Sequence, residues 1–328
     1  MPFSRSINRL SSVVLFATAT LVFYSPAYAA SCCGGGSSGA LLLPKFSRAM
    51  VDLSWSAERY DGFWNRAGEW VPDPAGSDLR QYRLTTGYAH RLAPRWQISA
   101  LLPYVWNDNR YAGMSRNTQG VGDSSVSLWY EAFDKIACVW EVNSWADLRP
   151  AIYWGATLTL PTGISPYDDV ADNFDITGRG SYRLDGSVML DKTIYPFNAT
   201  FSAAYGRYLE RPVNREYGTY VEPYDRQLGD RFSSSVALGY TYFTDEMESI
   251  TATLAYAYLE EDETTIDGVE DTTSGLLKKS LTATLAWATE DRDWVVKLSW
   301  SRGLRRDDWG SNFPVTDLLS VGVSHVLR

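Results

Sequence analysis

Charged side chains recur at every second position in several segments whose intervening residues are apolar. Arg183 and Asp185 form one such pair, and Asp52 and Glu58 share one face of another segment. Alternate residues of a strand point the same way, so these charges can converge on a common space. There they could select and orient a solute or pair to hold a wall rigid, and both interpretations stay open. The predicted charged lining, or constriction, consists of Asp52, Glu58, Arg83, Arg91, Glu131, Arg183, Asp185 and Lys297.

Catalytic and metal chemistry are poorly represented. The chain has two histidines, His90 and His325, and both fall on the apolar parity near a segment end. A Ser-His nucleophile needs the imidazole within hydrogen-bond reach of a hydroxyl, and there is no H-E-x-x-H motif. We therefore expect no enzyme activity, no cofactor and no metal site, and we keep a lipid-active enzyme as a minor alternative.

Acidic residues cluster in two connectors. The clusters could hold divalent cations or favour cationic solutes, but a solvated acidic surface is the favoured interpretation. The residues are Glu260, Glu261, Asp262, Glu263, Asp267, Glu270 and Asp271 in one connector, and Asp168, Asp169, Asp172 and Asp175 in the other.

The three cysteines suggest a disulfide rather than a metal site. Cys32 and Cys33 are adjacent, and Cys138 is far along the chain. Export to an oxidising compartment favours pairing Cys138 with one of the other two, which leaves one thiol over. Lipidation of Cys32 is disfavoured because Ala29 stands where a Leu-like residue is expected.

Residues 1–29 are organised as a secretory signal peptide. Arg5 and Arg9 precede an apolar run, and Ala27-Tyr28-Ala29 is an A-x-A cleavage pattern. Without this leader the formal charge of the 328-residue chain goes from −9 to −11, and an acidic chain repels nucleic acid. No later stretch has the roughly 18 consecutive apolar residues that a helical span requires.

From residue 46 onward a period of two predicts an all-β chain. Large aromatic residues fall at both ends of the apolar faces, with smaller apolar residues between them. This arrangement is typical of the lipid-facing surface of a closed transmembrane barrel, whereas a soluble sandwich has no reason to sort its aromatic residues in this way. The twelve predicted strands are 46–58, 79–92, 96–106, 121–133, 150–160, 181–191, 197–208, 231–243, 249–260, 277–289, 294–302 and 317–328.

The connectors alternate in length. Long ones are expected at 59–78, 107–120, 161–180, 209–230, 261–276 and 303–316, and the others are short except 134–149, which contains Cys138. Long extracellular loops and short periplasmic turns characterise outer-membrane barrels. We therefore predict a closed antiparallel barrel over 46–328, with both chain ends on the periplasmic side.

Twelve strands should enclose a narrow bore. Strands eight to ten contribute small residues to the inner face, so we expect one bare wall opposite a charged one. Residues 30–45 form a Cys-, Gly- and Ser-rich periplasmic segment. We favour a tail or partner-docking segment for it over a plug in the lumen.

Two short motifs suggest a family. Gly120-Val121-Gly122-Asp123 and Leu158-Thr159-Leu160-Pro161-Thr162-Gly163, with the hairpin of 184–191 and 197–205, resemble an outer-membrane transporter family associated with the meta-pathway of phenol degradation. The resemblance covers roughly residues 79–260. It implies passage of hydrophobic or aromatic small molecules and brings no catalytic residues.

We therefore expect a channel or transporter for small molecules in a Gram-negative outer membrane. Its partners would be outer-membrane lipid, lipopolysaccharide and a small-molecule solute. The alternative is a non-conducting barrel that docks a periplasmic protein through residues 32–44 and 134–149.

Overall fold

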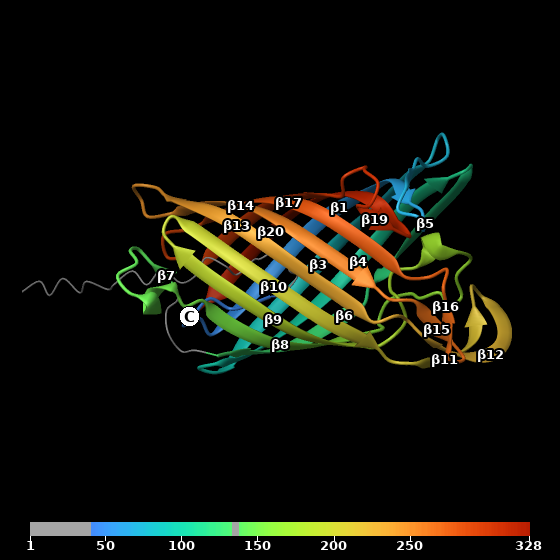
Figure 1. The fold of residues 1–328 in the computed structure, drawn as a ribbon, viewed down its shortest axis with the longest axis horizontal. Helices are drawn as coiled ribbons and strands as arrows, with labels where there is room; N and C mark the ends of the chain where they lie inside the picture. The colour runs from blue at the N-terminus through green and yellow to red at the C-terminus, as the bar shows by residue number, and fades with distance from the viewer. Residues whose placement is uncertain (1–40, 133–137) are drawn as a thin grey trace, which may run out of the picture.

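The computed structural model describes residues 41–132 and 138–328, and the leader, Cys32 and Cys33 lie outside these ranges. The chain forms a tilted, twisted barrel (Figure 1). Its twelve strands are β1 (Ala49–Trp64), β3 (Asp78–Ala93), β4 (Trp96–Tyr111), β6 (Ser124–Glu131), β8 (Ala151–Leu160), β9 (Arg183–Ile194), β10 (Phe197–Tyr208), β13 (Arg231–Phe243), β14 (Ser249–Glu261), β17 (Leu276–Ala288), β18 (Trp294–Arg302) and β20 (Phe313–Leu327).

The barrel is closed, as the sequence predicts. The last strand pairs with the first, from Ala49 opposite Leu327 to Trp64 opposite Phe313. Each strand is antiparallel to its neighbours around the ring, so none of the twelve is a free edge. In hydrocarbon this closure is what gives every backbone N–H and C=O a partner.

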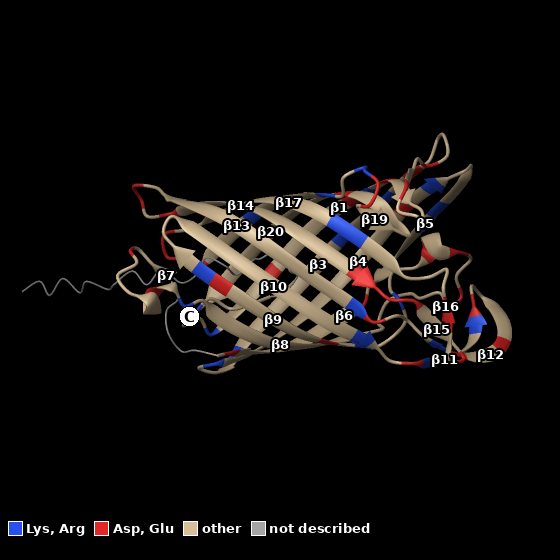
Figure 2. Cartoon of the chain, in the orientation of Figure 1, with Lys and Arg blue, Asp and Glu red and all other residues tan. Residues whose placement is uncertain are grey.

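The outward face is apolar at alternate positions. On β1, Val51, Leu53 and Trp55 are 43, 48 and 41 % exposed, while Met50, which has the opposite parity, is buried inside. Aromatic pairs mark both ends of this face: Trp55 stacks on Tyr82 with ring centroids 6.1 Å apart at the long-loop end. Most acidic and basic residues gather at the two barrel ends and in the loops (Figure 2). This distribution matches a lipid-facing band with aromatic girdles.

Three of the connectors that were predicted to be long contain hairpins. Residues 107–120 extend β4 into β5 (Met114–Val121). Two other loops supply β11 (Arg211–Glu216) with β12 (Thr219–Gln227), and β15 (Thr264–Ile266) with β16 (Val269–Asp271), which together form a four-stranded sheet at the long-loop end (Figure 1).

The turns explain these hairpins. Ala112-Gly113, Tyr217-Gly218 and Asp267-Gly268 have φ of 48 and 88°, 44 and 72°, and 49 and 76°. Two consecutive positive φ angles define the tight hairpin turn whose twist matches the flanking strands. The sequence analysis predicted the length of these connectors but not their hairpins, although each turn ends in the glycine that favours it.

Short elements complete the chain. They are β2 (Trp70–Val71), β7 (Cys138–Val139), β19 (Gly310–Ser311) and the 3₁₀ turns η1 (Trp145–Leu148) and η2 (Asn173–Asp175). Within 41–132 and 138–328, no helix has the length and apolarity to cross a membrane.

Candidate solute pathway in the lumen

The segment before β1 lies inside the barrel at the short-turn end. Leu41, Leu42 and Leu43 are 8, 5 and 4 % exposed. Leu41 and Leu43 pack with Met50 and residues of β3 and β20. Leu42 packs on the other side of the bore, with Trp129, Ala151, Tyr153 and Met189. Residues 41–45 therefore lie in the lumen, and we call them the plug. The rest of the segment for which a tail or docking role was favoured, residues 30–40, lies outside the described residues.

Polar contacts fix the plug at both ends. The Leu43 N–H donates to Gln97 Oε1 at 2.7 Å. Lys45 Nζ lies 2.8 Å from Glu131 Oε1, and both side chains are nearly buried. Arg91 donates to the carbonyl oxygens of Pro44 at 3.0 Å and Ser47 at 2.8 Å. Two predicted lining residues, Glu131 and Arg91, thus hold the plug.

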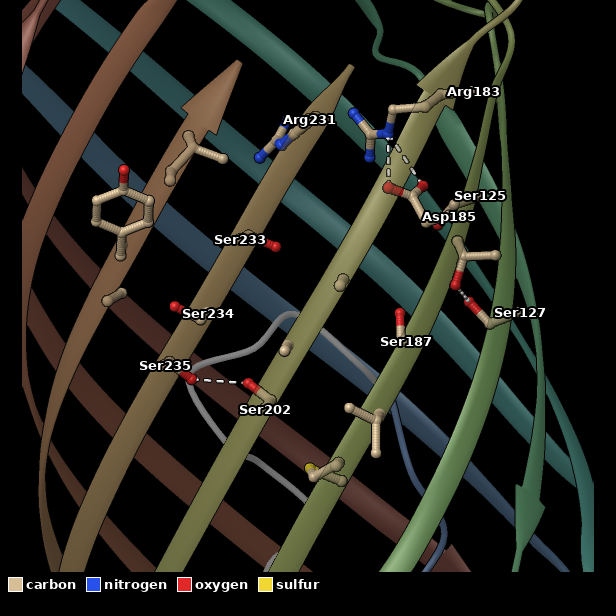
Figure 3. A pocket seen from close by; sticks show the side chains of 18 of the residues that line it. Ser125, Ser127, Arg183, Asp185, Ser187, Ser202, Arg231, Ser233, Ser234 and Ser235 are labelled. Atoms are coloured by element: carbon tan, nitrogen blue, oxygen red, sulfur yellow. Dashed lines mark hydrogen bonds and ion pairs between the residues drawn. The ribbon is translucent and has the colours of Figure 1, made fainter. Parts of the chain in front are cut away.

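A cavity of about 420 Å³ lies between the plug and the long-loop end, against β6, β8, β9, β10, β13, β14 and β17 (Figure 3). We call it the chamber. Its walls are rich in hydroxyl groups because small polar residues occupy the inward positions of these strands. Several pair across strands, such as Ser202 with Ser235 at 2.8 Å and Ser127 with Thr157 at 2.8 Å. Leu101, Trp129 and Met189 give it an apolar floor toward the plug.

Charged residues surround the top of the chamber. Arg183 Nε donates to both oxygens of Asp185, at 2.9 and 3.0 Å, and its Nη1 donates to the Tyr208 hydroxyl at 2.9 Å. The register places Asp185 beside Gly206 of the next strand, and a Cβ at position 206 would clash with Asp185 Oδ1. Glycine at 206 therefore makes room for the carboxylate.

Residues that the sequence analysis missed complete this group. Arg231 and Lys278 line the chamber from β13 and β17, so the wall expected to be bare is charged at its long-loop end. The sequence shows that both side chains have the inward parity. Each residue lies at the start of its strand, before the run of small inward residues. Lys278 Nζ lies 3.9 Å from Glu58 Oε1, and Arg179 Nη1 lies 2.7 Å from Glu261 Oε2.

The other predicted lining residues are dispersed. Asp52 accepts a hydrogen bond from Ser324 Oγ at 2.6 Å. Arg83 donates to Gln81 at 2.6 Å and not to Glu58, and Lys297 lies opposite Gly322 on β20. Of the eight residues, Arg183 and Asp185 form an ion pair with one another.

The two sequence motifs fasten a loop over the barrel mouth. Asp123 accepts hydrogen bonds from the Gly163 N–H at 3.1 Å and the Arg179 N–H at 2.6 Å. Thr162 Oγ1 donates to the Gly122 carbonyl at 2.7 Å. These contacts hold residues 161–182 against β5 and β6 and place Arg179 above the chamber.

Some acidic side chains of the two acidic connectors stabilise the loops in which they lie. Asp168 accepts from the Ser165 N–H and hydroxyl, each at 2.7 Å, and Glu261 is buried against Arg179. Burial and the neighbouring Glu260 raise the pKa of Asp262. In the outer sheet, burial and the hydrogen bond to Glu216 raise the pKa of Tyr224 to about 12. In the described part of the chain no group of three His, Cys, Asp or Glu is placed to hold a metal ion.

The remaining sequence candidates lie at the short-turn end. Cys138 is in β7 and pairs in parallel with β9 opposite Thr193, whereas its two predicted partners lie outside the described residues. The Tyr88 hydroxyl is 3.2 Å from His90 Nδ1, and His325 stacks on Trp294 at 4.3 Å. Both histidines thus sit among the aromatic residues of the outer rim.

Known proteins resemble this chain in fold. No protein-family model and no curated protein matches it. Among solved structures, an outer membrane channel from Pseudomonas putida F1 aligns with 14 % identity and a TM-score of 0.64, covering 89 % of this chain and 99 % of that one. The β domain of the Bordetella autotransporter Brka aligns with 11 % identity and a TM-score of 0.51, covering 85 and 100 %.

The class of protein is defined by the closed sheet, the aromatic girdles and these fold likenesses. The chain has the fold of an outer-membrane β-barrel with twelve strands. Its lumen contains the plug, the hydroxyl-lined chamber and the charged residues at the mouth.

Proposed function

We propose that this barrel is an outer-membrane channel that passes small molecules through its lumen. The observation that carries the proposal is the chamber, because a purely structural barrel of twelve strands has no need of a 420 Å³ space lined by hydroxyl groups. The resemblance of residues 120–123 and 158–163 to the meta-pathway family, and the fold likeness to an outer membrane channel, support the same proposal.

In this proposal the plug is a gate. Residues 41–45 close the lumen at the short-turn end, which is the periplasmic end in this proposal. Passage then requires the plug to shift. The solute would enter at the long-loop end, rest in the chamber and leave when Leu41–Leu43 move aside. The mature chain would comprise the segment 30–45 and the barrel 46–328.

The second candidate is a non-conducting barrel that docks a periplasmic partner. Trp145 and Trp140 in the connector between β6 and β8 are 89 and 62 % exposed, which is unusual for tryptophan. A lipid-active enzyme is a third candidate and requires lipid turnover that disappears in His90→Ala or His325→Ala.

Planar-bilayer conductance separates channel from scaffold. We expect small openings from the full chain and larger or longer ones after deletion of residues 31–45. If the deletion variant inserts but never conducts, the channel proposal fails and the scaffold stands.

A further inference from the structure

The top of the chamber carries more positive than negative charge. We define the basic ring by its inward side chains at the long-loop end: the cations Arg83, Arg179, Arg183, Arg231 and Lys278, with the carboxylates Glu58, Asp123, Asp185 and Glu261. Five cations face four carboxylates, so the ring has a formal excess of one positive charge.

Among the chamber-lining cations Arg183, Arg231 and Lys278, Arg231 is the one without a carboxylate partner in the described part of the chain. Arg183 is engaged by Asp185 and Tyr208, and Arg179 by Glu261. Arg231 lies opposite Glu261 in the strand register, but that carboxylate is turned to Arg179. In the described part of the chain no carboxylate comes within 4.0 Å of the Arg231 guanidinium, whose polar neighbour is Tyr208. Arg231 and Arg183 point toward one another over the chamber (Figure 3).

This arrangement suits a carboxylate. A guanidinium presents parallel N–H groups whose spacing matches the two oxygens of a carboxylate, and Lys278 on the adjoining wall adds a second positive charge. Partial withdrawal from water strengthens such contacts. An anion would neutralise the excess charge of the ring.

The chamber below the ring suits the rest of such a solute. Ser202, Ser233 and Ser235 offer hydroxyl groups along its wall, while Leu101 and Trp129 supply apolar surface at its floor. A small molecule with one anionic end and a compact, partly apolar body would satisfy both parts at once. A neutral hydrocarbon would leave the ring without a counterion.

We propose that the chamber binds small monocarboxylates, with Arg231 as the principal contact for the carboxylate. This inference rests on the channel function and names its substrate class. Glu260 lies on the outer face of β14, and Asp262 and Glu263 follow that strand outside the lumen. Water and salt screen such exterior charges, so they do not cancel the field of the ring.

Three probes of similar shape test the proposal: benzoate, neutral benzamide and cationic benzamidine. Uptake into liposomes that contain the full chain should be fastest for benzoate and slowest for benzamidine. In a KCl gradient the reversal potential should show preference for chloride. Arg231→Ser should weaken benzoate binding about ten- to hundredfold, as expected for loss of a charged hydrogen-bonding partner, and Arg231→Lys should weaken it less.

Arg207→Ser is the matched control. Arg207 lies at the same height on β10 but faces outward, so its loss should leave selectivity unchanged. Benzamidine uptake equal to that of benzoate, or equal effects of the serine substitutions at 207 and 231, would overturn the carboxylate site.

Benzoate binding to the detergent-solubilised protein, followed by tryptophan fluorescence, separates this inference from the channel function. A conducting protein that binds no benzoate retains the channel and refutes the site. A protein that binds benzoate through Arg231 but never conducts retains the site and refutes the channel.

Discussion

Replacing Leu42 by serine should release the plug. Leu42 is 5 % exposed and packs on Trp129 and Met189, which also form the chamber floor. Burying a leucine side chain stabilises by about 1.5–3 kcal/mol, so Leu41, Leu42 and Leu43 together contribute about 5–9 kcal/mol. Ordering a residue costs about 1–2 kcal/mol for the backbone and about 0.5–1 kcal/mol for a leucine side chain, or about 5–9 kcal/mol for three.

The free energy of burial and the entropy cost of ordering nearly cancel, so a small difference in free energy decides whether the plug is inserted or displaced. Two polar contacts favour the inserted state: the ion pair between Lys45 and Glu131 and the hydrogen bond between Leu43 and Gln97. Loss of about 1.5–3 kcal/mol in Leu42→Ser should shift the ratio of displaced to inserted plug by roughly ten- to hundredfold. The chamber would then open to the short-turn end.

Single-channel recording measures this shift as the fraction of time spent in the more conductive state. Leu209→Ser is the control, because Leu209 is 51 % exposed at the far end of the barrel. An open fraction in Leu42→Ser that equals those of wild type and Leu209→Ser would refute the gating argument.

Three further predictions concern other parts of the barrel. Glu261→Gln should raise the preference for anions, the reverse of Arg231→Ser, because it removes a carboxylate buried against Arg179; reversal potentials give the sign. Trp64→Ala should destabilise the fold by about 3–5 kcal/mol, measured by urea unfolding. The reason is that Trp64 is 0 % exposed and its Nε1 donates to the Arg306 carbonyl at 2.9 Å. Trp145→Ala is the control and should have little effect on the free energy of unfolding. Hydrogen bonds from the Ser144 side chain and from backbone N–H groups hold the pKa of Asp147 below 3.8, so the η1 turn should keep its full stability above pH 3.8 and lose it as the pH falls through the lower, folded-state pKa. Hydrogen exchange at the Asn143 and Ser144 amides should show this loss of protection in wild type and not in Asp147→Asn.

The period-two pattern predicted the barrel because lipid imposes it. A lipid-facing position must be apolar along its whole strand, so positions such as Val51, Leu53 and Trp55 reveal the parity directly. The strand limits were accurate to a few residues except at the loop end, where β1 continues to Trp64 and β4 to Tyr111. Beyond the membrane that constraint ends, and turn residues such as Asp267-Gly268 decide the structure.

The plug and the charged pairs could not be predicted in this way. Three leucines after a glycine- and serine-rich stretch carry no signal that they enter a lumen, because their partners come from β3, β6, β9 and β20. Lys278 and Glu58 approach across two intervening strands. Parity tells which side chains face inward, but contacts across a bore depend on tilt and closure, which no single segment encodes.

The plug and the basic ring should control different properties of the channel. Leu42 is uncharged and lies below the chamber floor, so Leu42→Ser should change the open fraction and leave the reversal potential unaltered. Arg231 lies above the chamber and does not belong to either cluster that contacts the plug, so Arg231→Ser should alter the reversal potential and leave the open fraction unaltered. Sites that share no partners are expected to act additively, so the double variant should show both changes at full size. A double variant whose selectivity depends on the state of the plug would mean that solute selection occurs at the gate rather than in the ring.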